Sequence, residues 1–375
     1  YIIKENRTYD QVFGDMPKGN GDPRLTIFGE KVTPNHHKIA REFVLLDNLY
    51  CDGEVSVDGH SWSNSAYATD FNEKLWPPNY GGISQASPTP AYVPSSGHMW
   101  DLAARKGLTW RSYGEYAQRV SDGSRQYMDA ASGVAGLVGH VSPRFKMPGM
   151  RDTDNARVFI EEFDEYEKHY DSPEAEKRLP NFMVMSLGED HTVGTRPGLP
   201  TPAAAVASND YALGMIVDRV THSKYWKETA IFVIEDDAQD GPDHVDARRT
   251  VGLVISPYTK RNALDSTLYT TSSMLRTMEL LLGLPPMTQY DAAATPMYAS
   301  FAAKADLTPY DHAKPQIDIN ALNSERAWGA QESLRMDFSE YDRTPMFALN
   351  EIVWKSVKGA DSEMPLPVRR FHFRR

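Results

Sequence analysis

The sequence predicts an α/β fold in which helices cover a mainly parallel central sheet. Five short apolar runs are rich in Val, Ile, Leu and Phe and lack the polar alternation of half-exposed strands, so they are expected to be buried on both faces. Segments with a helical period lie between these runs, which is typical of layered α/β proteins. With 375 residues, of which 41% are hydrophobic, the chain can bury a large core.

The expected strands follow one another at residues 1–4, 43–50, 181–187, 230–234 and 251–256. Helices are expected at residues 209–220, whose apolar side chains form one stripe, and at residues 272–282, which follow two threonines suited to capping. The chain begins inside an expected strand, which predicts that a leader or another domain precedes it.

Residues 72–150 are expected to be loops inserted into a single domain that spans residues 1–375. They are rich in Gly, Pro and Ser, yet they retain aromatic side chains such as Trp76 and Tyr92. Plain surface loops and a cap over a substrate pocket are the two interpretations of this composition.

The tail, residues 318–375, is expected to be a helical extension that packs on the domain. The apolar residues of one expected helical face are Leu349, Ile352, Val353 and Trp354. No chemistry is assigned to this segment.

Charge and cysteine content exclude several classes of protein. The formal net charge of −11 argues against a protein whose main task is to bind nucleic acid or anionic lipid. No apolar run approaches the ~18–20 residues of a membrane span. The single cysteine, Cys51, leaves no internal disulfide and follows an apolar run directly, so a buried side chain is favoured over a nucleophile with His60 as its base.

Polar residues follow four of the expected strands. Those singled out are Glu5, Asn6, Ser56, His60, Asp190, His191, Asp236, Asp237 and, further along, His244. A turn, a helix cap or a solvated loop would explain each of them alone. Because ligands of open α/β sheets bind at the carboxyl ends of the strands, the set predicts one metal-assisted site.

The residue types indicate a division of roles at this site. Glu5, Asn6, Asp236, Asp237 and the Ser56 hydroxyl are oxygen donors, which favour Ca²⁺, Mg²⁺ or Mn²⁺ over thiolate-bound zinc. A cation there would activate Ser56 as a nucleophile, and a helix that begins near His60 or Ser61 would add amide donors for a phosphate.

His60, His191 and His244 are expected to donate hydrogen bonds to phosphoryl oxygens or to protonate a leaving alcohol. Asp190 is expected to be a further ligand, which with His191 and His244 would complete a second metal site. The pair His36 and His37 is interpreted as a turn or a helix start.

Several motifs resemble one family. Glu-Asn-Arg-Thr-Tyr-Asp at residues 5–10 resembles the opening motif of the phosphoesterase family that contains bacterial phospholipases C and an acid phosphatase, within the alkaline phosphatase superfamily. Residues 188–192 resemble its Asn-Asp-His-Thr motif, and residues 236–245 resemble its Asp-Glu-His-Gly-Gly-Phe-Tyr-Asp-His-Val segment. Residues 56–60 resemble the superfamily nucleophile pattern, Thr/Ser-x-Pro-Asn-His/Arg, although Asp58 replaces its proline.

The resemblance implies an alkaline-phosphatase-like α/β/α sandwich and the metal-dependent hydrolysis of a small phosphate ester through a phosphoserine. Glu5, Asn6, Asp236 and Asp237 match metal ligands (for Ca, Mg, Mn or Zn), and Ser56 matches the nucleophile. The closest resemblance is to bacterial proteins in which this domain follows a β-propeller. It therefore also implies an upstream propeller and a periplasmic or secreted location.

One departure concerns Arg248, which stands where propeller-linked relatives often carry a histidine and which would contact phosphate instead. Three alternatives stay open. The substrate is a phosphodiester, as in a phospholipase C, or it is a sulfate or phosphonate ester on the same scaffold, or the chain is a non-catalytic module that binds metal or phosphate.

Overall fold

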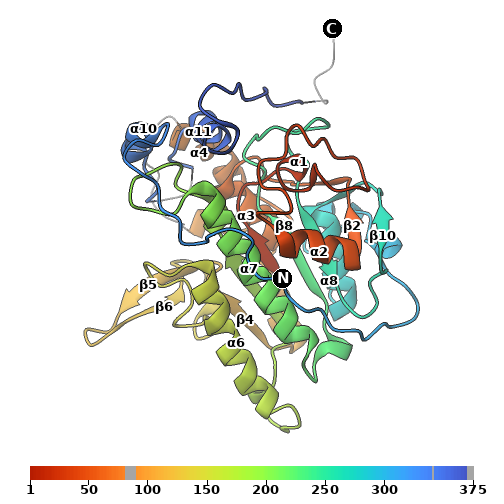
Figure 1. Cartoon of the computed structure of the whole chain (residues 1–375). Coiled ribbons are helices and arrows are strands. Elements are labelled where there is room, and N and C mark those ends of the chain that lie inside the picture. The colour runs from red at the N-terminus through yellow and green to blue at the C-terminus, as the bar shows by residue number, and fades with distance from the viewer. Residues whose placement is uncertain (81–89, 340–341, 370–375) are drawn as a thin grey trace.

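A five-stranded sheet lies at the centre of the computed structural model, which describes residues 1–80, 90–339 and 342–369 (Figure 1). Its strands are, in order across the sheet, β4 (Trp110–Tyr113), β7 (Phe182–Leu187), β1 (Ile2–Lys4), β8 (Ile231–Glu235) and β9 (Gly252–Ile255). The first four strands run parallel, and β9 is antiparallel to β8. The predicted α/β fold with a mainly parallel sheet is confirmed.

Helices cover both faces of this sheet. Ile2 belongs to one apolar core, with α2 (Pro34–Glu42), α6 (Asp152–Lys168) and α7 (Pro202–Thr221). Ile3 belongs to a second core on the opposite face, with α5 (Met99–Lys106) and α8 (Thr271–Leu282). Successive strand residues point to opposite faces, which explains why the buried runs are continuously apolar.

The long helices α6 and α7 pack side by side (Figure 1). Helix α7 extends the predicted helix at residues 209–220 toward the N-terminus, because Thr201 accepts a hydrogen bond from the backbone of Ala204 and Pro202 occupies the first turn. Helix α8 closely matches the predicted helix at residues 272–282.

The predicted strand at residues 43–50 is divided in two. Its halves, β2 (Val44–Leu46) and β3 (Leu49–Tyr50), pair with β10 (Ala263–Asp265) and β11 (Tyr269–Thr270) and not with the central sheet. The polar pair Asp47 and Asn48 interrupts it, because their side chains bond the backbone of other segments, at Asn20 and Ser266.

Residues 72–150 are more ordered than loops. Besides α5, they contain most of α4 (Asp70–Tyr80), the hairpin of β5 (Ala117–Ser121) and β6 (Gln126–Ala130), and β4, the edge strand of the central sheet. Because β4 lies at the edge, it can carry the half-buried Arg111, which pairs with Glu162. This polar residue interrupts the apolar pattern, so the strand was not predicted from the sequence. Residues 81–89 of the expected cap lie outside the described residues.

The C-terminal segment contains the short helix α10 (Ala330–Arg335) and α11 (Met346–Lys358). The four apolar residues predicted for one face of this extension are buried in a third core, against Leu25, Ile27, Phe28 and Val206. The other short helices are α1 (Tyr9–Phe13), α3 (Ser56–Ser65) and α9 (Gln289–Ala293). Within the described part of the chain, no helix combines the length and hydropathy that a membrane span requires.

Candidate active site

The register of the central sheet places two of the predicted ligands side by side. Lys4, the last residue of β1, lies opposite Glu235, the last residue of β8. Because these strands are parallel, Glu5 and Asp236 leave the same edge of the sheet together, and each is buried.

Ser56, the first residue of α3, lies against this edge. Its hydroxyl donates a hydrogen bond to Asp237 Oδ2 at 3.1 Å and accepts one from Asn6 Nδ2 at 3.3 Å. Asn6 adopts a left-handed backbone conformation with φ of 71°, which is uncommon outside glycine. Residues that follow the first strand and a late strand therefore meet the start of helix α3 at one hydroxyl.

His60 lies one turn further along α3. Its Nδ1 is 2.8 Å from Glu115 Oε1, while its Nε2 is 3.7 Å from Glu5 Oε1 and 3.6 Å from Asp236 Oδ2. Burial acts to lower the pKa of His60, but these carboxylates outweigh it and hold the pKa well above its usual value. His60 is thus fixed by Glu115 and faces the predicted ligands.

The acidic groups at the sheet edge are buried close together and repel one another. Burial and the charge of Asp237 raise the pKa of Asp236 well above its usual value, and burial and the charge of Asp342 do the same for Asp237. Burial also acts to raise the pKa of Glu5, but the neighbouring His60 prevails and lowers it to about 2. Within the described chain, neither carboxylate oxygen of Asp236 has a hydrogen-bond partner.

Asp190, predicted as a further ligand, is engaged by other protein groups. Lys4 Nζ donates to its Oδ2 at 2.6 Å, and the backbone of Glu5 and the side chain of Asn209 donate to its Oδ1. A buried cation that also bonds Glu235 therefore already balances this carboxylate.

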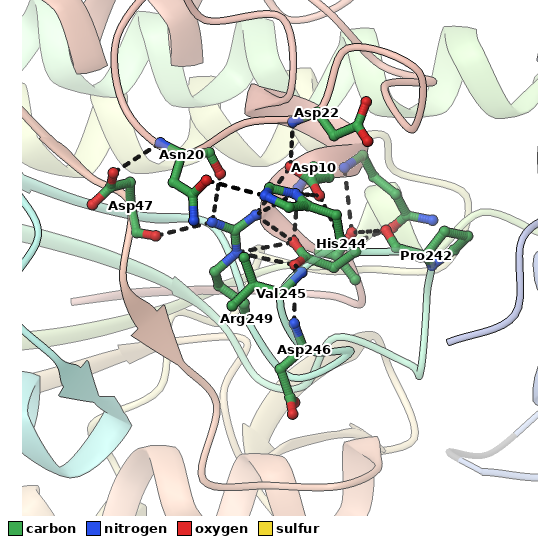
Figure 2. Close-up of polar contacts among 12 residues, drawn as sticks. Asp10, Asn20, Asp22, Asp47, Pro242, His244, Val245, Asp246 and Arg249 are labelled. Atoms are coloured by element: carbon green, nitrogen blue, oxygen red, sulfur yellow. Dashed lines mark hydrogen bonds and ion pairs between the residues drawn. The ribbon is translucent and has the colours of Figure 1, made fainter. Parts of the chain in front are cut away.

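His244 lies in a second polar network (Figure 2). Its Nδ1 is 2.6 Å from Asp10 Oδ2, and its Nε2 is 3.1 Å from Asn20 Oδ1. Asp10, Asp243 and His244 are close enough to share a metal ion, but the buried Arg249 guanidinium donates to both carboxylates. A cation of the protein itself thus occupies this cluster, and the second metal site predicted from Asp190, His191 and His244 is not assembled.

The remaining candidates lie in ordinary structural contacts. His36 and His37 start helix α2, as one interpretation predicted, and their rings pair with Asp210 and Asp15.

Cys51 is buried, and burial raises the pKa of its thiol well above the usual value, which is consistent with an inert side chain. Arg248, which was expected to contact phosphate, donates to Asp246.

A cavity of about 840 Å³ opens over Glu5 and His60. Its apolar wall includes Tyr92, Tyr116, Met150, Leu199 and Phe338, and its basic side chains are Lys146, Arg151 and His191. Much of this lining comes from residues 72–150 and from the C-terminal segment. His191 therefore lines the cavity, and its role as a proton donor stays a prediction.

Three site residues have no signal in the sequence. Glu115 orients His60, and Lys146 Nζ lies 3.9 Å from Glu5 Oε1 while donating to Ser186. Asp342 accepts hydrogen bonds from the backbone of Ser56 at 3.0 Å and of Val57 at 2.8 Å.

Comparison with solved structures shows similarities of fold. A putative sulfatase from Bacteroides thetaiotaomicron VPI-5482 is 10% identical with a TM-score of 0.50, over 82% of this chain and 75% of that one. A protein in the alkaline phosphatase superfamily from Vibrio parahaemolyticus is 18% identical with a TM-score of 0.48, over 78% and 68%. Human ectonucleotide pyrophosphatase/phosphodiesterase 5 is 11% identical with a TM-score of 0.44, over 76% and 95%.

No curated protein matches the sequence. The sequence profile of the Phosphoesterase family, in contrast, matches residues 20–285, which is more than half of the chain. The family match confirms the predicted class, a phosphoester hydrolase. The central sheet with a helix-covered core on each face confirms the predicted α/β/α sandwich. The chain therefore belongs to the Phosphoesterase family.

Proposed function

We propose that the protein hydrolyses phosphate esters through a phosphoserine intermediate on Ser56, with the help of a divalent cation. The observation that carries this proposal is the position of the Ser56 hydroxyl, which starts a helix and hydrogen-bonds both Asn6 and Asp237. Two further oxygen-bearing side chains, Glu5 and Asp236, follow the ends of β1 and β8 at the same edge of the sheet.

The donor set fits a hard cation. The two buried Asp236 oxygens lack hydrogen-bond partners within the described residues, and the repulsion between Asp236 and Asp237 is of the kind that a cation relieves. Glu5, Asn6, Asp236 and Asp237 would hold the ion, and their oxygens favour Ca²⁺, Mg²⁺ or Mn²⁺. When bound, the ion supplies charge stabilisation to the phosphoryl oxygens.

Side chains of the protein carry out the remaining chemical steps. Ser56 Oγ attacks phosphorus and passes its proton to Asp237 Oδ2, to which it already donates. The ester oxygen leaves on the opposite side toward the cavity, where His191 protonates it. Water then attacks the phosphoserine and gives a proton to His191, while the bond from Ser56 Oγ to phosphorus breaks and Oγ recovers its proton from Asp237, which releases phosphate.

The Ser56→Ala variant tests this proposal directly. Turnover of a chromogenic phosphate ester should fall at least about a thousandfold, because the nucleophile is removed while the helix stays intact. Radiolabelled substrate should label the native protein at Ser56, as mass spectrometry after an acid quench would show. Ser65→Ala, a buried serine on the same helix, serves as the matched control and should keep its activity. Unchanged turnover in Ser56→Ala contradicts the proposal.

A further inference from the structure

The C-terminal segment places a carboxylate on the amides that begin the nucleophile helix. Asp342 is buried, and its two oxygens accept from the backbone N–H groups of Ser56 and Val57 at 3.0 and 2.8 Å. The first amides of a helix are the donors that usually receive a phosphate, because they are unpaired and carry the positive end of the helix dipole. Here a carboxylate of the protein takes that position.

This contact adds negative charge to an edge that is already acidic. Asp342 lies beside a group that contains Glu5, Asp236 and Asp237, and it also lines the cavity. Two of the nearby basic side chains have acidic partners, since Lys146 lies 3.9 Å from the Glu5 carboxylate and Arg151 is paired with Glu189. Asp342 therefore repels a substrate with two negative charges more strongly than a substrate with one.

Phosphate esters differ in this property. A phosphomonoester above its second pKa carries two charges on three terminal oxygens, whereas a phosphodiester carries one charge and a second ester substituent. The cavity of about 840 Å³ offers that second substituent an apolar wall that includes Tyr116 and Phe338.

We propose that Asp342 is a specificity-determining residue that selects monoanionic phosphodiesters over dianionic phosphomonoesters. This inference rests on the proposed hydrolysis of phosphate esters, whose substrate class it narrows. Asp342 acts through its charge and through the two amides it withholds from a third phosphoryl oxygen.

The test compares the native protein with Asp342→Asn on bis(4-nitrophenyl) phosphate and 4-nitrophenyl phosphate. At about pH 8 the monoester is a dianion, because its second pKa is near 6. The native protein should prefer the diester. In Asp342→Asn the monoester-to-diester ratio of kcat/KM should rise about tenfold or more, since one charge within a few ångströms is removed.

Two variants control this experiment. Asp342→Glu retains the charge and should retain the diester preference. Asp337→Asn removes an exposed carboxylate from the same segment and should leave the ratio unchanged. Thermal unfolding of each variant verifies that it is folded.

A binding measurement separates this inference from the proposed function. In a Ser56→Ala background, inorganic phosphate should bind about tenfold more tightly when Asp342→Asn is added, and dimethyl phosphate should not. An unchanged ratio in folded Asp342→Asn, a native preference for the monoester, or unchanged phosphate affinity overturns the role of Asp342. Failure of the native protein to hydrolyse either ester overturns the proposed function, while the affinity measurement still decides how Asp342 treats a dianion.

Discussion

Gly59 illustrates how a single residue controls the position of Ser56, the proposed nucleophile. A Cβ atom at this position would lie 2.7 Å from the backbone oxygen of Asp236. Only the absence of a side chain therefore allows helix α3 to approach the end of β8 closely enough for Ser56 to contact Asp237.

We expect Gly59→Ala to move α3 away from β8. Overpacking should reduce the free energy of unfolding by about 1–3 kcal/mol, and a displaced nucleophile should lower kcat about a hundredfold. Urea denaturation and steady-state kinetics measure the two effects. A variant with native kcat would show that the close approach is not needed for turnover.

Asp190 shows where residue-level inference from sequence fails. Its place after a strand predicted a metal ligand, but Lys4 Nζ lies 2.6 Å from its Oδ2 and balances the charge of the carboxylate. Because Lys4 belongs to the apolar run of the first strand, nothing in the local sequence indicates that its ammonium group turns toward Asp190.

At the scale of the element, the start of helix α3 carries an unusual carboxylate. Asp58 accepts hydrogen bonds from the backbone of Glu54 and Val55, yet burial raises its pKa from about 3.8 to about 7. A raised pKa in the folded protein means that the protonated form is favoured. Stability from this group is therefore present at low pH and is lost as the pH rises through about 7.

Asp58→Asn should remove this dependence on pH. The free energy of unfolding of the native protein should fall relative to that of the variant between about pH 4 and pH 7. Chemical denaturation at several pH values measures the difference. A constant difference across this range would show that Asp58 does not titrate in this window.

Helix α11 anchors the segment that carries Asp342. Its residue Ile352 is fully buried in the third core, whereas Val357 on the same helix is 38% exposed. Ile352→Ala should destabilise the protein by about 2–5 kcal/mol, and Val357→Ala should have little effect. Thermal denaturation measures both. Equal effects would mean that the face assigned to the core is wrong.

At the scale of the whole molecule, a bound cation should raise the thermal stability of the folded protein. A ligand that binds only the folded state raises the melting temperature, by the equivalent of about 2.7 kcal/mol at 100 times its Kd. After treatment with a chelator, adding Mn²⁺, Mg²⁺ or Ca²⁺ should raise the Tm of the native protein. Asp236→Ala should abolish this shift, while Asp122→Ala, in an exposed turn, should not. Equal shifts in native protein and Asp236→Ala would place the ion elsewhere.

The sequence predicts those parts of the site that follow from strand ends. Glu5, Asn6, Asp236 and Asp237 come directly after apolar runs, and parallel pairing brings such residues to one edge. The apolar runs predicted the fold class. A helix was expected to begin near His60 or Ser61, and α3 begins earlier, at Ser56.

The remaining site residues depend on contacts between distant segments. Glu115 and Lys146 lie among residues with little periodicity, and Asp342 lies 286 residues after Ser56, whose backbone it contacts. His244 follows the same late strand as Asp237 but turns toward Asp10. Long-range packing decides these positions, and no local pattern records it.

The central position of β1 has a consequence for how this protein is made. This strand pairs on one side with β7 and on the other with β8, which follow it by more than 170 residues. A chain emerging from a ribosome must therefore keep this apolar strand without its first neighbour until β7 has been synthesised, and without its second until β8 has been synthesised. Assembly of the catalytic centre is thus a late event in folding, and chaperones that shield unpaired strands should influence the yield of active protein.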